Sequence, residues 1–392
     1  MKNAVIIGAG QTGRGFIAPI LQDDEYTITF IDKDEELIKS LNQKKEYSIR
    51  YFGNTAPTRK IDAFKAFAST SGEAVEAIRN ADVICTSVFS SHLAELIPLF
   101  REVEKERKTP MQIICCENGV NVKKDLVAAK LNACITEGII FCTTLRPNKD
   151  SLDLLCENIQ DLPIDASVEG LTVSVRRMPL ERKFADLIQR KIYTYNFMSA
   201  IVSYLGWYKG YEIYGKAAND SDIAYVIEKI KPVVSRVIAH VYAISEEEQL
   251  AFTQRAIDKF QNEEIIDTIY RNARQAKRKL GANERILSPM RMATQQAEDI
   301  TWMKLIAVAA MDYAVCEENE ELESVYQDLQ VFLSEKDILD IRNLLEKFQS
   351  KESLSKMIQS LCFVELFLIL MVLYWKWATL ICQKVPYRLC SN

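Results

Sequence analysis

The chain has 392 residues, of which 48% are hydrophobic and 26% are charged, and its formal net charge is −5. This length allows two domains, and this composition is typical of a folded chain rather than a disordered one. The acidic balance and the lack of a basic run argue against a nucleic-acid-binding protein, which usually carries a basic face.

Short apolar runs alternate with amphipathic stretches in the N-terminal half. We predict strands at 3–7, 26–31, 61–68, 83–88, 112–116 and 138–141, and extra strands at 47–52 and 171–175. We predict helices at 16–22, 35–42, 72–79, 93–104 and 123–131. Strands that alternate with helices pair in parallel through right-handed crossovers. Residues 1–180 are therefore predicted to form a doubly wound α/β domain.

From about residue 180 the pattern changes to a helical period, with brief breaks near 206–215 and 281–289. This pattern predicts an all-helical second domain over residues 181–355. Pro232 is expected near the start of one helix, where its missing N–H removes no internal hydrogen bond.

Residues 356–392 form an apolar tail, in which the run 361–381 is interrupted by Glu365 and Lys376. A membrane span usually needs about 20 largely uncharged residues, so the two charges argue against one. A buried terminal helix and an altered reading frame near the end of the gene are the other two explanations, and all three stay open.

A glycine-rich turn, Gly8-Ala9-Gly10-Gln11-Thr12-Gly13, follows the first predicted strand directly. In such a turn the first glycine permits the tight bend, the second lets a pyrophosphate approach the backbone, and the third lets helix and strand pack closely. The following helix would direct its free N–H groups at the phosphates, with Arg14 near them. The second strand leads to Asp32, 19 residues after Gly13, where a carboxylate can bind the ribose hydroxyls and repel a 2′-phosphate. We predict a Rossmann-type domain that binds NAD.

The stretch from Lys191 to Ser199 offers a second group of reactive side chains. On a regular α-helix, Asn196 would lie about 140° and Ser199 about 80° from Lys191, so the three could share one broad face. A lysine in a partly desolvated cleft has a lowered pKa and can exchange a proton with a substrate oxygen, which a neighbouring asparagine can hold. On spacing alone, a solvent-exposed polar face is the commoner explanation.

The segment Gly8-Ala-Gly-Gln-Thr-Gly-Arg-Gly-Phe-Ile17 resembles the opening of the polyol-specific long-chain dehydrogenases, the mannitol dehydrogenase family. The resemblance covers roughly residues 1–350 and continues in Thr29-Phe-Ile-Asp-Lys33, Cys116-Glu-Asn118, Lys191–Asn196, Tyr204-Leu-Gly206 and Asn283-Glu-Arg-Ile286. The Arg-Gly-Phe after the glycine turn points to the phosphate-using branch. The resemblance implies a Rossmann domain, a helical substrate domain, NAD, and metal-independent hydride transfer at the cleft between the domains.

By position in the family motif, Lys191 would be the general acid/base, and Asn196 and Asn118 would hold the reacting oxygen. The motif is a lysine, four residues, an asparagine, two residues and a histidine, and this chain has Ser199 at the histidine position. Serine can form hydrogen bonds, but it is shorter and does not titrate near neutral pH. The only two histidines, His92 and His240, are not placed by the sequence to replace it.

Two basic residues are candidates for binding a sugar phosphate, Arg285 in the 281–289 loop and Lys209 after Gly206. A solvent-exposed basic loop without such a role is the alternative. The leading hypothesis is therefore the interconversion of a hexitol phosphate and a ketose phosphate, D-mannitol 1-phosphate and D-fructose 6-phosphate. One alternative is a reductase of a free polyol or of a keto-sugar acid such as tagaturonate or fructuronate, since Arg285 could equally pair with a carboxylate. Another is an NAD-binding protein without catalytic activity, whose site has decayed at Ser199.

The ten cysteines show no CxxC pair and no spacing that suits a metal site. We expect reduced thiols and no metal. Without a recognisable signal peptide we also expect a cytoplasmic location. The expected partner is a small polyol or sugar phosphate rather than a nucleic acid or a membrane, and the oligomeric state stays open.

Overall fold

The computed structural model describes residues 2–117, 119, 121–148, 151–363 and 371. The chain divides after Gln189 into two compact units. The N-terminal unit is an α/β domain and the C-terminal unit is helical, so the predicted fold class is confirmed.

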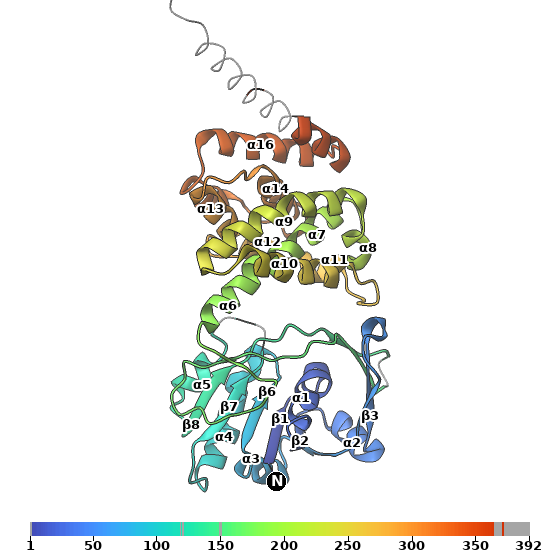
Figure 1. Cartoon of the computed structure of the whole chain (residues 1–392), viewed down its shortest axis with the longest axis vertical. Helices are drawn as coiled ribbons and strands as arrows, with labels where there is room; N and C mark the ends of the chain where they lie inside the picture. Colours follow the sequence, from blue (N-terminus) through green and yellow to red (C-terminus); the bar gives the residue numbers. More distant parts are fainter. Residues whose placement is uncertain (1, 118, 120, 149–150, 364–370, 372–392) are drawn as a thin grey trace, which may run out of the picture. The chain divides into compact units, whose positions relative to one another are not determined.

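A six-stranded sheet forms the centre of the N-terminal unit, and all its strand pairs are parallel. Its strands, in spatial order, are β5 (Phe64–Ala68), β2 (Tyr26–Asp32), β1 (Lys2–Ile7), β6 (Val83–Thr86), β7 (Met111–Cys115) and β8 (Ala133–Glu137). Most of these strands lie side by side in Figure 1. The order reverses direction between β1 and β6, and this is the place where open α/β sheets bind ligands, at the carboxyl ends of the strands.

Helices and short 3-10 or π segments connect these strands. They are η1 (Gly13–Ile17), α1 (Ala18–Gln22), α2 (Glu35–Lys44), α3 (Gly72–Arg79), η3 (Ser90–Leu96), α4 (Ile97–Glu104) and α5 (Lys124–Ala128). Two begin with a polar cap, because the Asp34 side chain accepts from Leu37 N–H and the Ser71 side chain from Ala74 N–H. Apolar side chains pack on both faces of the sheet, in two separate clusters. Burial on both faces explains why the strands read as nearly continuous apolar runs.

Two small sheets complete this unit, and they correct three predicted strands. The small sheets contain β3 (Tyr47–Tyr51, followed by η2, Phe52–Asn54), β4 (Arg59–Ile61), β9 (Thr144–Leu145) and β10 (Leu154–Cys156), and the pair β11 (Ile164–Asp165) and β12 (Leu180–Glu181). The predicted strand 61–68 is two strands in different sheets, and the strand predicted at 138–141 lies instead at β8. Residues 171–175 are buried in part but form no strand, because the side-chain amide of Gln112 bonds the backbone of Gly170 and Thr172.

The C-terminal unit is built around helices that are buried almost all round. Its elements are α6 (Phe184–Lys191, which begins before the division), η4 (Ile192–Asn196), α7 (Phe197–Tyr208), α8 (Tyr214–Ala218), α9 (Ser221–Tyr242), α10 (Glu246–Gln261), α11 (Ile269–Ala273), α12 (Ala276–Lys279), α13 (Leu287–Gln295), α14 (Thr301–Glu318), α15 (Glu323–Gln330) and α16 (Glu335–Gln349). Residues 302–314 of α14 are all buried. Helix α7 packs on α14 through an edge-to-face contact of Tyr204 and Tyr313, and α16 lies over α14 (Figure 1).

Helix α9 contains Pro232 in its interior, so the prediction of a helix starting near this residue was wrong. The helix begins eleven residues earlier, where the Asp220 side chain accepts hydrogen bonds from the N–H groups of Asp222 and Ile223. Proline removes one internal hydrogen bond, but Ile230 and Val234 on either side of it are buried in the core. Packing of these residues in the core therefore stabilises the helix despite the proline.

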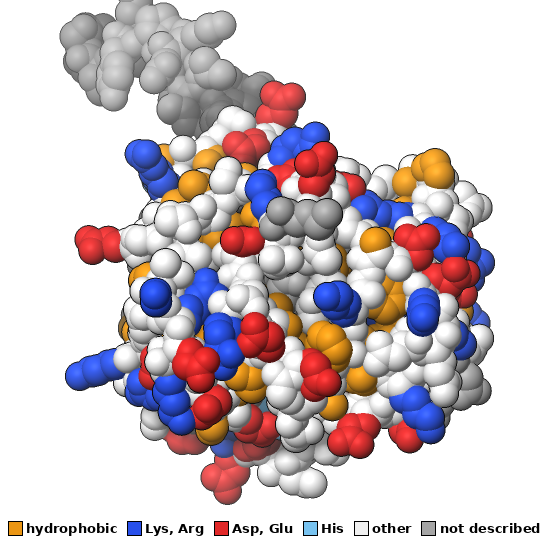
Figure 2. Space-filling view, turned by 90° about the horizontal axis from the view of Figure 1, so that it is seen from below, with side chains coloured by type: hydrophobic (Ala, Val, Ile, Leu, Met, Phe, Trp, Pro, Cys, Tyr) orange, Lys and Arg blue, Asp and Glu red, His pale blue; other side chains and the backbone are white. Residues whose placement is uncertain are grey.

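The apolar tail lies outside the described residues from position 364 onward, apart from Met371. Among the residues that the structure does describe, no helix is long and apolar enough to cross a membrane. On the face seen in Figure 2, basic and acidic side chains are intermixed, and apolar side chains lie between them.

Candidate active site

The glycine turn after β1 has one glycine that faces open space and two that face protein. Gly8 has a φ of +101°, and a Cβ there would lie 2.3 Å from the carbonyl oxygen of Ser87. A Cβ on Gly13 would lie 2.2 Å from the carbonyl oxygen of Gly8, whereas a Cβ on Gly10 would meet nothing within 4 Å. Gly8 and Gly13 are thus required by the packing of the protein itself. Gly10 leaves space for a group that approaches the backbone from outside, which suits a pyrophosphate.

Asp32, the last residue of β2, forms a hydrogen bond with the backbone of this turn. Its Oδ2 atom accepts a hydrogen bond from the Ala9 N–H at 2.7 Å, and its Oδ1 atom accepts one from the Asp34 N–H at 3.0 Å. Gln11 and Thr12, which begin the next helix, are partly exposed. The structure therefore brings together the turn, the helix start and the carboxylate that the sequence singled out.

Arg14 lies behind the turn and not on its open side. Its side chain is fully buried, and it donates to the carbonyl oxygens of Ala9 (2.7 Å) and Leu152. The guanidinium also lies 5.2 Å from the centre of the Tyr47 ring. Burial lowers the pKa of Arg14 to about 10. The structure thus gives Arg14 a part in holding the shape of the turn, and its predicted place near the dinucleotide phosphates stays a prediction.

Glu117 is a residue at this edge of the sheet that the sequence patterns did not single out. It follows β7 and its carboxylate accepts hydrogen bonds from the Thr86 hydroxyl and the Val88 N–H, both at 3.0 Å. Only 6% of the residue is exposed, and this burial raises the pKa of the carboxyl to about 7. Glu117 thus ties the end of β7 to the loop after β6, next to the turn at Gly8. An acidic residue directly after an apolar strand was the available signal. Asn118 beside it lies outside the described residues.

In the helical unit, a π-helical segment separates Lys191 from Ser199. Residues Ile192–Asn196 form η4, between α6 and α7. A π turn holds about one residue more than an α turn, so the residues after it are rotated back by about 100°. Lys191, Asn196 and Ser199 then fall within about 60° of one another rather than on the broad face expected for a regular helix. Such π turns are frequent at functional sites.

Lys191 is the titratable group of this segment. It is partly buried, and loss of solvent together with the positive charge of Lys259 lowers the pKa of its ammonium group to about 7. Asn196 is also partly exposed. A lysine with this pKa can give and take a proton near neutral pH, which an ordinary surface lysine cannot do.

Ser199 has a tyrosine partner that the sequence did not indicate. The Tyr214 hydroxyl donates to Ser199 Oγ at 2.8 Å, and burial raises the pKa of Tyr214 above its usual range. Tyr214 lies at the start of α8, fifteen residues along the chain. His92 lies in η3 of the N-terminal unit beside Glu95, and His240 is exposed near the end of α9, so neither histidine stands in this segment.

The two basic residues proposed for a phosphate differ in their surroundings. Lys209 donates to both carboxylate oxygens of Asp220 and to Asp222, all at 2.7 Å. Its three protons are occupied, so the structure does not support the expectation that Lys209 binds a phosphate. Arg285 is mostly buried. Its Nε atom lies 3.5 Å from the Glu284 carboxylate and forms no hydrogen bond with the described residues.

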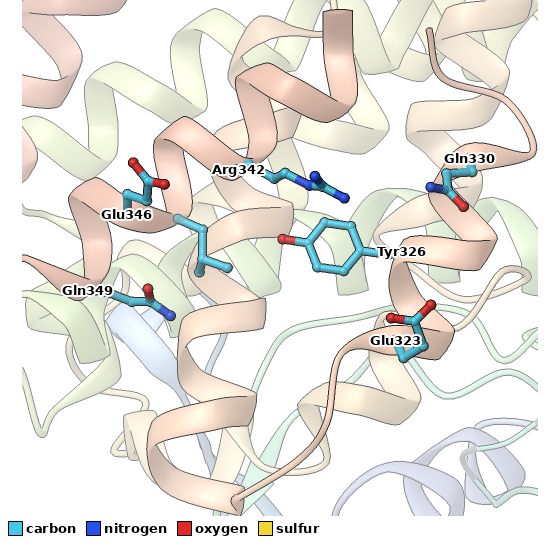
Figure 3. Close-up of a pocket in the computed structure, with 7 residues that line it drawn as sticks. Glu323, Tyr326, Gln330, Arg342, Glu346 and Gln349 are labelled. Atoms are coloured by element: carbon cyan, nitrogen blue, oxygen red, sulfur yellow. The ribbon is translucent and has the colours of Figure 1, made fainter. Parts of the chain in front are cut away.

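A hollow of about 370 Å³ elsewhere in the helical unit contains none of these residues. It lies between α15 and α16, where Arg342 stands over the Tyr326 ring, 5.6 Å from its centre (Figure 3). In the ranges that the structure describes, no group of three His, Cys, Asp or Glu side chains is arranged to hold a metal ion.

A parallel sheet with a glycine turn after its first strand and a carboxylate after its second defines a dinucleotide-binding domain of the Rossmann class. Family models give the more specific assignment. The mannitol dehydrogenase Rossmann domain matches residues 2–161, and the mannitol dehydrogenase C-terminal domain matches residues 184–363. The chain belongs to the mannitol dehydrogenase family, which confirms the predicted family and the prediction of a dehydrogenase.

Two relatives and two solved structures illustrate the likeness. A mannitol-1-phosphate 5-dehydrogenase of Anoxybacillus flavithermus is 30% identical over 73% of this chain and 80% of its own length. The mannitol-1-phosphate 5-dehydrogenase of Exiguobacterium sibiricum is 29% identical over 91% of this chain and 96% of its own length. A D-sorbitol dehydrogenase structure covers 89% of this chain and 93% of its own, at a TM-score of 0.74 and 12% identity. The structure of Pseudomonas fluorescens mannitol 2-dehydrogenase with NAD and D-mannitol covers 91% of this chain and 94% of its own, at a TM-score of 0.67 and 13% identity. These two structures support the fold.

Proposed function

We propose that this chain is an NAD-dependent dehydrogenase that interconverts D-mannitol 1-phosphate and D-fructose 6-phosphate without a metal ion. The observation that carries the proposal is the lysine of the π-helical segment, whose pKa is lowered to about 7 in a chain of this family. The names of the relatives, mannitol-1-phosphate 5-dehydrogenases, support the phosphorylated substrate.

Lys191 serves as the general acid/base of the proposed reaction. In the oxidation of the polyol, neutral Lys191 takes the proton of the reacting hydroxyl at Nζ, and in the reduction the ammonium form returns it to the carbonyl oxygen. Asn196 donates an amide N–H to that oxygen and stabilises the negative charge that develops there. Asn118 is assigned the same task by its position in the family motif. NAD, when bound, supplies the hydride acceptor.

The N-terminal unit fits the proposed cofactor. Open space at Gly10 admits the pyrophosphate, and the partly exposed start of the helix at Gln11 and Thr12 offers N–H groups to it. The carboxylate of Asp32 favours a free ribose hydroxyl over a 2′-phosphate, and therefore NAD over NADP. Arg14 stabilises the shape of the glycine turn by donating a hydrogen bond to the Ala9 carbonyl oxygen.

Ser199 replaces the histidine of the family motif as a neutral hydrogen-bonding group. With its Oγ accepting from Tyr214, the serine hydroxyl can direct its own proton toward a substrate oxygen. A serine at this position lacks the charge of an imidazolium, so the lysine is the main titrating group of the segment.

A cytoplasmic location is part of the proposal. Eight of the ten cysteines lie in the described ranges, six of them are buried, and these eight are all free thiols. Reduced cysteines suit a reducing compartment.

Parallel assays of NADH oxidation test the proposal, with D-fructose 6-phosphate, D-fructose, fructuronate and tagaturonate as substrates for wild type and Lys191→Ala. We expect turnover of D-fructose 6-phosphate by wild type and loss of most of it in the variant. If NADH binds and no substrate is reduced, the chain is a non-catalytic NAD-binding protein. If fructuronate or tagaturonate is preferred, the substrate assignment is wrong.

A further inference from the structure

A group of four basic side chains gathers around α12 and the loop after it. Lys279 is the last residue of α12 and is only 6% exposed. Arg285 stands in the loop, and Arg274 and Arg278 are close enough for their charges to act on Lys279. Like charges crowded in this way are unfavourable unless an anion lies among them.

Lys279 is held in this group by one described hydrogen bond, to the carbonyl oxygen of Asn272. A neutral carbonyl does not balance a buried charge. The pKa of Lys279 is lowered to about 7, mainly by the loss of solvent and next by the charges of the nearby arginines. An anion placed beside Lys279 would therefore be bound by a lysine that becomes fully protonated only in its presence.

Arg285 faces a similar deficit. Its Nε atom is buried and lacks a hydrogen-bond acceptor within the described part of the chain, although Glu284 lies 3.5 Å away as an ion-pair partner. Loss of solvent, as the first cause, lowers the pKa of Arg285 below its usual range. A buried guanidinium N–H whose carboxylate partner lies at the outer limit of hydrogen-bond reach is poorly satisfied, and an incoming anion would supply a better acceptor.

Counting the charges indicates which anion fits. With Lys279 protonated, as it would be beside a bound anion, the group holds four cations, and two carboxylates accompany them. Glu284 pairs with Arg278 at 2.7 Å, and Glu318 accepts from the N–H groups of Gln275 and Ala276 at the start of α12. Two positive charges remain, which matches the charge of a phosphate monoester near neutral pH, about −1.5 to −2. A carboxylate would balance only one of them.

The group adjoins the π-helical segment of the active site. The Tyr193 hydroxyl, on η4, donates to the carbonyl oxygen of Asn283 at 3.3 Å, two residues before Arg285. Tyr204 of α7 donates to the carbonyl oxygen of Ala273 at 3.0 Å, just before α12. The loop that carries Arg285 is therefore bonded to η4, and the end of α11, just before α12, is bonded to α7. η4 and α7 meet at Asn196.

We propose that Lys279 and Arg285 form the binding site for the phosphoryl group of the substrate, with Arg278 and Arg274 supplying further positive potential. This inference rests on the proposed function, because it assigns the non-reacting end of the same substrate. It makes Lys279 a residue that determines specificity for a phosphate monoester over an uncharged sugar.

Lys279→Met tests the site, with Lys277→Met as the matched control. Lys277 lies on the same helix and is half exposed, and its charge is balanced by Glu320 at 2.8 Å. We expect Lys279→Met to raise KM for D-fructose 6-phosphate by about 10- to 100-fold, since hydrogen bonds to charged groups contribute that much. The KM for D-fructose, which has no phosphoryl group, should change far less than that for D-fructose 6-phosphate, and Lys277→Met should behave as wild type. Equal KM values for the two variants would overturn the site while leaving the proposed function intact.

A binding measurement on the wild-type protein does not depend on the folding of any variant. Sulfate is a dianion that does not titrate near neutral pH, so any proton taken up on binding comes from the protein. At pH 8, titration calorimetry in two buffers should show sulfate binding with proton uptake, because the anion raises the pKa of Lys279. Sulfate binding without proton uptake would contradict the site. Uptake by a protein that reduces none of the sugars would support the anion site and refute the proposed function.

Discussion

The lowered pKa of Lys191 predicts a pH dependence that an ordinary lysine would not produce. At pH 7 a lysine with its usual pKa of 10.5 is neutral in about 1 molecule in 3,000. With a pKa of about 7, roughly half of the Lys191 side chains are neutral at that pH. The lowered pKa thus makes the neutral form about 1,500 times more abundant. General acid/base groups contribute about 10²- to 10⁴-fold to rates, so Lys191→Met should lower kcat/KM by about that factor.

Profiles of kcat against pH, measured at saturating substrate in both directions, provide the assay, because the bound phosphoryl group keeps Lys279 protonated and leaves Lys191 as the titrating group. In the proposed mechanism, oxidation of the polyol needs neutral Lys191, so its rate should rise with pH and level off above pH 7. Reduction of the ketose needs the ammonium form, so its rate should be level below pH 7 and fall above it. Lys259→Gln removes a positive charge that lowers the pKa of Lys191, and it should move both midpoints to higher pH. Lys231→Gln serves as the control, since Lys231 pairs with Glu228 at 2.7 Å and is not among the causes of that shift.

Two results would refute this reasoning. A midpoint above pH 9 in wild type would mean that Lys191 is not desolvated in the working enzyme. A Lys191→Met variant with nearly wild-type kcat/KM would mean that another group carries the proton.

Three further predictions concern the cofactor turn and Ser199. Gly10→Ala should melt at the wild-type temperature but bind NADH at least about tenfold more weakly, because its new methyl group meets only the ligand. Gly13→Ala should lose thermal stability as well, since its Cβ would overlap the Gly8 carbonyl; equal melting temperatures for the two variants would contradict this. Asp32→Asn should narrow the preference for NADH over NADPH in paired Kd measurements, and an unchanged ratio would remove Asp32 from cofactor selection. Ser199→His should add a second ionisation to the pH–rate profile near the histidine pKa of about 6.5, and an unaltered profile would place Ser199 outside the site.

Much of the N-terminal unit could be predicted because its signals are local. The strand, glycine turn and helix at residues 4–22, together with Asp32, form a motif whose geometry depends on backbone sterics. The outer strands were less predictable, because an apolar run such as 171–175 also occurs in buried extended segments. There the backbone bonds the side chain of Gln112, which lies about 60 residues away. No local pattern indicates a partner at that distance.

In the helical unit, the resemblance to the family motif singled out Lys191, Asn196 and Ser199 but did not give their arrangement. The π turn that draws them together depends on packing against the surrounding helices and leaves no pattern in the sequence. The contact between Tyr214 and Ser199 and the burial of Lys279 arise in the same way, from residues that meet only in the folded unit. Lys209 was a candidate for binding a phosphate, and no pattern in the sequence indicated its ion pairs with Asp220 and Asp222 at the start of the next long helix.

The most direct test of the central claim is the ratio of kcat/KM for D-fructose 6-phosphate to that for fructuronate, measured with NADH as the reductant. We predict a ratio well above ten for the wild-type protein and a value near one for Lys279→Met. A wild-type ratio below one, or NADH binding without reduction of either compound, would contradict the assignment of this chain as a polyol-phosphate dehydrogenase.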